Sequence, residues 1–248
     1  RVGNGKQSVN YVELRQMFLQ SQSLEESILA YRKERISYYR DQEDTPDLSY
    51  SRFMLLHIIP ETFRDSSHKK SMFYLQRKVN LSSIFFAYGC DTQSVPNVDG
   101  IRYPSFDRIG ACLLCNDGTA ECFYPLQRRL LVNQNREYFP TTKVLNQIET
   151  TVRQYIEIMR DILDTSRIFV GISFLGCKGI LTDVNPGYDY LGCIDRNTGI
   201  CTPIAIHDLS VNNDVEKSYK LIKIDCALSL GIKNSETLDG LLDEVHHE

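Results

Sequence analysis

The longest regular pattern in the chain is an apolar stripe with helical spacing between Thr142 and Leu163. Its apolar side chains recur at intervals of three and four residues, which places them on one side of an α-helix. The set is Val144, Leu145, Ile148, Val152, Tyr155, Ile156, Met159, Ile162 and Leu163. Pro140 stands just before it, and Thr141 or Thr142 can cap the first turn. The pattern predicts a long one-sided helix that organises a domain core.

Strand-like runs lie on both sides of this helix. Ser51 to Ile59 is a continuous apolar run, as expected of a strand buried on both faces, and Ile168 to Leu175 is similar. Between them, Arg108 to Cys115 and Thr119 to Leu126 flank an Asn-Asp-Gly turn, which predicts a hairpin. We therefore expect an α+β fold, in which a mixed or antiparallel sheet is packed by the long central helix.

The chain also predicts helices at its two ends. Asn10 with Glu13, and Ser23 with Glu26, have capping-box spacing and indicate two successive N-terminal helices. Near the other end, the run from Asp214 to Leu230 has helical spacing and should end at Gly231 in a left-handed conformation. The Asn-, Pro- and Gly-rich stretch before it, residues 183–199, is predicted to be a long surface loop.

The second N-terminal helix carries a candidate interface. Its apolar stripe consists of Leu24, Ile28, Tyr31 and Ile36. An acidic stretch with Pro46 follows, so we place a boundary there, between residues 1–46 and an α+β region of residues 47–248. A lone helix of this length is marginal in water, so the stripe needs a partner. Docking within the same chain and a homodimer are the two alternatives.

Composition and charge describe a globular chain with a modest acidic excess. The net charge of -4 argues against a surface coated with nucleic acid, because such binding depends on neutralising phosphates. One basic cluster stands apart, and its members Lys69, Lys70, Arg77 and Lys78 are candidate phosphate contacts. The alternative for this cluster is an ordinary solvated helix face. No apolar stretch approaches the ~18 residues that a membrane helix requires, and the start at Arg1 indicates an excised fragment.

Cysteine spacing raises the question of a metal. Cys112 and Cys115, with Cys122 beyond, have the spacing of half a zinc ribbon, but a second ligand pair is missing. On a regular strand an offset of three also points Cys112 and Cys115 to opposite faces. We therefore expect buried thiols in a reducing cytoplasm and no cofactor. A zinc-binding module or a metal-dependent nucleic-acid-processing enzyme is the alternative.

Other motifs fall short of a catalytic set. His57 could act as a base, yet a single histidine in an apolar strand is usually a core residue. The run from Gly171 to Gly179 approaches a phosphate-binding loop, but Lys178 comes one position late and no helix is predicted to follow. A buried strand leading into a glycine turn explains this run better. The chain is therefore more readily interpreted as a non-enzyme.

Several short motifs are spread along the chain. They are the Arg1–Ser8 loop, Leu24–Ile28 with Arg32–Arg35, the Leu-His-Ile-Ile-Pro strand Leu56–Pro60, the loop with Asn97, Asp99 and Gly100, and Leu175–Gly179. Together these segments resemble prokaryotic proteins of the Schlafen/AlbA type, which carry a DNA-binding domain upstream of such a region. The resemblance implies that residues 1–46 are the tail of an upstream Schlafen/AlbA-type domain plus a helical linker, and that residues 47–248 are an accessory domain.

What the resemblance implies about activity is limited. The acidic residues that make some Schlafen proteins nucleases belong to the upstream domain and have no match in this chain. The expected function is therefore a non-enzymatic accessory or regulatory role in a nucleic-acid-binding protein, through contacts between domains or subunits. The expected partners are the upstream domain, nucleic acid and a second copy of the chain.

Overall fold

The computed structural model describes residues 11–40, 52–71, 74–75, 95–96, 98–104, 111–126, 131–133, 136–160, 162, 165–183, 192–196, 198–201, 203–209 and 212–232. It divides into two compact units, Arg1–Tyr39 and Arg40–Glu248, and each is described by itself. The predicted linker around Pro46 lies outside the described residues.

The first unit is built on one helix, α1 (Tyr11–Arg40). The prediction of two successive helices is wrong, because Ser23 and Glu26 lie inside this helix rather than at its start. The hydroxyl of Ser27 donates to the carbonyl oxygen of Ser23 one turn earlier, at 2.8 Å. Serine residues are good capping residues, but a hydroxyl that bonds to the preceding turn also allows them inside a helix.

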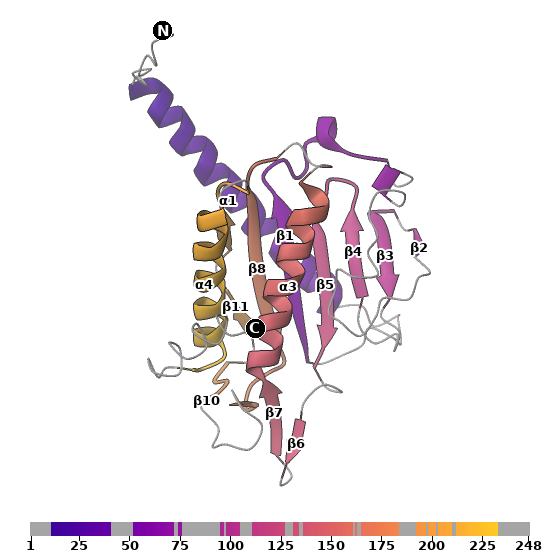
Figure 1. Ribbon diagram of the computed structural model, residues 1–248, viewed down its shortest axis with the longest axis vertical. Coiled ribbons are helices and arrows are strands. Elements are labelled where there is room, and N and C mark those ends of the chain that lie inside the picture. The colour runs from indigo at the N-terminus through magenta and orange to yellow at the C-terminus, as the bar shows by residue number, and fades with distance from the viewer. Residues whose placement is uncertain are drawn as a thin grey trace. The chain divides into compact units, whose positions relative to one another are not determined.

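A large antiparallel sheet is the main element of the second unit (Figure 1). Its strand order is β11-β8-β1-β5-β4-β3-β2, and β12 also pairs with β8. The strands are β1 (Phe53–Pro60), β2 (Val95–Pro96), β3 (Gly100–Pro104), β4 (Ala111–Cys115), β5 (Ala120–Pro125), β8 (Ile168–Leu175), β11 (Thr198–Ile200) and β12 (Ile204–Ile206). Every residue of β1 and β8 is buried. The prediction of strands buried on both faces is therefore confirmed.

A second, smaller sheet contains one parallel pair of strands. Its order is β10-β9-β7-β6, where β7 pairs with β9 in parallel and the other pairs are antiparallel. The strands are β6 (Leu131–Asn133), β7 (Arg136–Pro140), β9 (Leu181–Asp183) and β10 (Gly192–Cys193). The predicted surface loop at residues 183–199 contains β10 and the start of β11, so that prediction is wrong in part. These strands are too short for an alternating pattern, and their pairing depends on tertiary neighbours.

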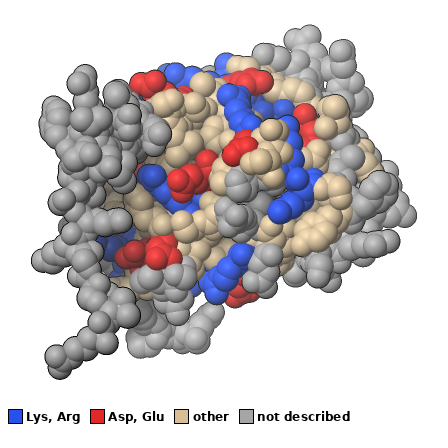
Figure 2. Space-filling view, turned by 90° about the horizontal axis from the view of Figure 1, so that it is seen from above, with Lys and Arg blue, Asp and Glu red and all other residues tan. Residues whose placement is uncertain are grey.

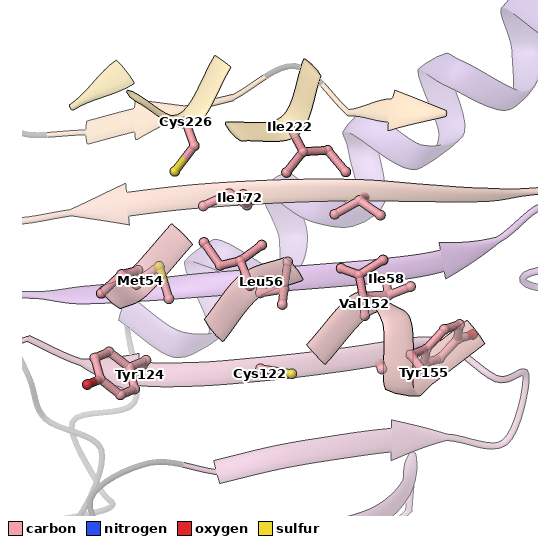
Figure 3. Close-up of a cluster of buried hydrophobic side chains, with 14 of the residues drawn as sticks. Met54, Leu56, Ile58, Cys122, Tyr124, Val152, Tyr155, Ile172, Ile222 and Cys226 are labelled. Atoms are coloured by element: carbon pink, nitrogen blue, oxygen red, sulfur yellow. The ribbon is translucent and has the colours of Figure 1, made fainter. Parts of the chain in front are cut away.

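Two helices, α3 (Thr141–Met159) and α4 (Asn212–Ser229), pack on one face of the large sheet (Figure 1). Figure 3 shows Val152 of α3 over β1 near Ile58 and Tyr155 of α3 beside β5, whereas α4 lies over β8. Gly231 has a φ of +83° and follows the end of α4, as predicted. The α+β fold with its long central helix and N-terminal helical segment is confirmed.

An ion-pair network joins α3 to α4. Arg153 donates to both carboxylate oxygens of Glu216, at 2.6 and 2.7 Å, and to Glu149 one turn earlier on α3. The buried Lys223 of α4 also pairs with Glu149. The hydrogen bonds with Glu216 are the main cause of the raised pKa of Arg153. The guanidinium carbon lies 4.3 Å from the ring centroid of Tyr219, so charge and packing reinforce each other here.

The difference in burial between Leu56 and Leu228 predicts that their substitutions differ in their effect on the free energy of unfolding. We expect Leu56→Ala to lower the free energy of unfolding by about 2 to 5 kcal/mol, because it leaves a cavity beneath α3. Leu228 of α4 is 48% exposed, so Leu228→Ala should stay within about 0.5 kcal/mol of the parent. Urea unfolding followed by circular dichroism measures both. Equal effects of the two substitutions would contradict the placement of β1 at the centre of the core.

Candidate functional site

Residues 61–70, here called the basic loop, follow the end of β1. The amide of Phe63 donates to the carbonyl oxygen of Pro60 at 3.0 Å, which turns the chain sharply. Arg64 then adopts a left-handed φ of 66°, a conformation uncommon for a residue with a side chain. The Asp65 carboxylate accepts from the amide of Ser67 at 2.9 Å and caps the short helix η1 (Ser66–His68). Local hydrogen bonds therefore give this loop a defined shape.

The β4–β5 turn, residues 116–119, holds the basic loop at two points. The amide of Arg64 donates to Oδ2 of Asp117 at 3.3 Å, and the amide of Lys70 donates to the carbonyl oxygen of Asn116 at 2.9 Å. The second oxygen of Asp117 accepts from the amide of Thr119 within the turn, at 3.0 Å. One carboxylate thus shapes the hairpin turn and fixes the loop beside it.

Tyr155 attaches the same turn to α3. Its buried hydroxyl donates to the carbonyl oxygen of Gly118 at 2.7 Å. Burial raises the pKa of Tyr155 well above its usual value, and the nearby charge of Asp117 raises it further. The phenol therefore keeps the proton that it donates. Gly118 has a φ of +88°, which a glycine adopts without strain.

The charges at this end of the sheet are mixed. Figure 2 looks onto this end and shows basic and acidic side chains side by side. Arg64 and Lys69 are exposed and Lys70 is half-buried, while Glu61 and Asp65 are exposed close by in the sequence. Of the predicted cluster, the structure brings Lys69 and Lys70 to the basic loop, whereas Arg77 and Lys78 lie outside the described residues. Flexible lysine side chains suit non-specific contacts with phosphates rather than recognition of bases.

The cysteines of the zinc-ribbon pattern lie on two faces of the sheet. Cys112 is directly opposite Cys122 and belongs to the core beneath the helices, with the two sulfur atoms 4.0 Å apart. Cys115 is three residues further along β4 and points to the other face. Across the described residues, no group of three or more His, Cys, Asp or Glu side chains could hold a metal ion. The three candidate ligands are therefore not brought together.

His57 lies inside the sheet and has an acidic neighbour. It is completely buried on β1, and its register partner on β5 is Glu121, which is also completely buried. Both side chains point away from α3 and α4 by strand alternation. Full burial is the environment of a core residue rather than of a base that meets a substrate. Glu121 was not predicted from the sequence, although a charged residue within an apolar strand is the kind of signal that marks a functional residue.

The run resembling a phosphate-binding loop is a strand and a turn. Gly171 lies within β8, and Gly176 and Gly179 have positive φ values of 69° and 84°. The next element is β9, so no helix begins there to hold a phosphate. The interpretation as a buried strand leading into a glycine turn is confirmed.

The candidate interface on α1 has an uneven exposure. Ile28 and Ile36 are buried, whereas Leu24 and Tyr31 are half-buried. Arg32 and Tyr39, which the apolar pattern did not include, are buried too. Positions 28, 32, 36 and 39 follow helical spacing, so they form one stripe along α1. The arginine was missed because a charged side chain breaks the apolar period, although its stem packs like an aliphatic chain.

No family model matches the chain, and no curated protein matches it either. Among the helices in the described part of the chain, none combines the length and apolar character needed to cross a bilayer.

The geometry of the β4–β5 turn predicts the effect of removing one carboxylate. In Asp117→Ala the amides of Arg64 and Thr119 lose their acceptor, so their hydrogen exchange should accelerate about fivefold, since one such bond contributes ~1 kcal/mol. Hydrogen exchange followed by mass spectrometry measures this. Asp195→Ala is the matched control, because Asp195 is exposed and its contact with Arg196 is long, at 4.0 Å. Equal exchange rates in both variants would show that Asp117 does not hold the basic loop.

Proposed function

We propose that the chain is a non-enzymatic accessory region of a Schlafen/AlbA-type nucleic-acid-binding protein. In this proposal it acts in the cytoplasm and supports an upstream domain of the same protein by contacting nucleic-acid phosphates and neighbouring domains or subunits. It has no catalytic residue of its own. Turnover of a nucleic acid or nucleotide by this chain, abolished by a single substitution, would contradict the proposal.

The observation that carries the nucleic-acid part is the fixed backbone of the basic loop. Hydrogen bonds from Arg64 and Lys70 to the β4–β5 turn hold both ends of the segment that bears Lys69. A fixed backbone lets lysine side chains meet an anionic surface with less loss of backbone entropy on binding. Tyr74 is 40% exposed and follows shortly after, so an aromatic face for stacking is available in the same segment.

The part of the proposal on domain and subunit contacts concerns α1. Buried Ile28 and Ile36 lie on one stripe, and an apolar stripe on a single helix is a typical contact surface. Docking within the same chain and a two-fold dimer both use such a surface. These two alternatives make different predictions about the oligomeric state.

Salt dependence tests the phosphate contacts. We expect a variant with Lys69, Lys70, Arg77 and Lys78 all changed to Gln to bind duplex DNA with a shallower dependence of log K on log salt. The magnitude of this slope should decrease by about 3 to 4, because each phosphate contact contributes roughly 0.9 to it. Fluorescence anisotropy with a labelled duplex over a salt series provides the slope.

The control for this experiment changes two other lysines. Lys217 and Lys220 are exposed on α4, so Lys217→Gln with Lys220→Gln lowers the net charge without touching the cluster. This variant should keep the parental slope. A quadruple variant that binds with the parental slope would mean that the basic cluster is a solvated surface only.

Sedimentation tests the role of α1. If the stripe forms a homodimer, Ile28→Asp should convert a dimer into a monomer, because a charge without a partner is strongly unfavourable in an apolar contact. Leu29→Asp is the matched control, since Leu29 is 38% exposed on the same turn. A parent chain that is monomeric at high concentration, with Ile28→Asp unchanged in mass, would exclude the dimer and leave docking within the chain.

A further inference from the structure

Cys112 on β4 and Cys122 on β5 form a pair of thiols in the core. They are register partners, their sulfur atoms are 4.0 Å apart, and each side chain is 1% exposed. Both lie on the sheet face that α3 covers, and Figure 3 shows Cys122 on β5 close to that helix. The pair has no part in the proposed nucleic-acid contacts, so its chemistry is independent of them.

The hydrogen-bond pattern of the hairpin shows what kind of pair this is. The amide of Cys115 donates to the carbonyl oxygen of Thr119 at 2.8 Å, so these two residues form a hydrogen-bonded pair. Pair types alternate along an antiparallel ladder, and Cys112 with Cys122 is three positions away. It is therefore a non-hydrogen-bonded pair, in which Cα atoms are typically about 4.5 Å apart. That separation lies within the range of about 4.4 to 6.8 Å that disulfides span.

We propose that Cys112 and Cys122 are a site of oxidative modification, which a small peroxide converts into a disulfide across β4 and β5. One thiol loses its proton and attacks hydrogen peroxide as the thiolate. The O–O bond breaks, a sulfenic acid forms, and the departing hydroxide takes up the proton to give the first molecule of water. The second thiol then attacks the sulfenic sulfur, and water leaves. In total, two thiols and one peroxide give one disulfide and two molecules of water. The thiols lose two electrons, which reduce the peroxide.

The surroundings select the oxidant. Side chains of α3 cover this face, so a thiol reagent the size of glutathione has no room to form a mixed disulfide. A sulfenic acid adds only one oxygen atom. The partner sulfur, at 4.0 Å, needs side-chain rotation to close the bond, whereas the strands already have the required spacing.

Cys115 provides an internal control on the same hairpin. It lies on the opposite face of β4, so the folded chain cannot join it to Cys122. In an unfolded chain Cys122 should instead form its disulfide with Cys115, because Cys115 is closer to Cys122 in sequence and the shorter loop closes more readily. The identity of the linked pair therefore reports whether the folded geometry directed the reaction.

The experiment treats the full chain with hydrogen peroxide under native conditions, then blocks remaining thiols with N-ethylmaleimide in denaturant. Trypsin leaves all three cysteines in one peptide, from Ile109 to Arg128, so a second cleavage before Asp117 is needed. It separates Cys112 and Cys115 from Cys122. We expect two peptides joined by a disulfide, in the parent and in Cys115→Ser, and a loss of the link after dithiothreitol.

The variants decide the outcome. Cys112→Ser and Cys122→Ser should show no linked peptides, and circular dichroism before oxidation checks that each is folded. Because the parent and Cys115→Ser alone already identify the pair, an unfolded Cys112→Ser does not affect the test. Fully alkylated thiols after peroxide, a sulfonic acid without a link, or a link that disappears in Cys115→Ser would each overturn the proposal.

Discussion

β1 is hydrogen-bonded on both sides and buried on both faces. It pairs with β5 along one edge and with β8 along the other, and its register with each is continuous. A one-residue slip in either ladder would turn Leu56 and Ile58 away from α3 and turn His57 toward it. The position of this strand therefore determines where the helices, the β4–β5 turn and the basic loop lie.

The β4–β5 turn is the second point on which the arrangement depends. Tyr155 attaches it to α3 from the core, and Asp117 attaches it to the basic loop at the surface. A single short turn thus connects the packed interior with the basic loop at the surface. Each of these hydrogen bonds joins a side chain to a backbone atom, so the connection depends on the Asp117 and Tyr155 side chains as well as on the conformation of the turn.

Sequence patterns identified the strongly periodic elements. α3 was predictable because its apolar residues keep one period over five turns, and β1 because an eight-residue apolar run suits a strand buried on both faces. The continuity of α1 was not, because residues with capping-box spacing can also lie inside a helix, as Ser23 and Glu26 do. Strands β10 and β11 were missed because two or three residues carry no period.

The candidate site was harder to predict from sequence patterns than the fold. The role of Asp117 within its own turn follows from turn chemistry, since aspartate commonly accepts from an amide two residues on. Its bond to Arg64 connects residues far apart in the sequence, and no local pattern encodes it. The same holds for the pairing of His57 with Glu121 and of Cys112 with Cys122, which depends on the register of neighbouring strands.

The position of β1 in the chain has a consequence for biosynthesis. β1 leaves the ribosome before the β4–β5 hairpin, and β8 leaves only after the whole of α3. Until β8 is made, β1 has one unpaired edge along an apolar strand, which is a template for association with other chains. Closing this long-range pair late makes folding slow compared with a helical domain of the same size. The strand that stabilises the finished domain is therefore also a segment that needs protection while the chain is being synthesised.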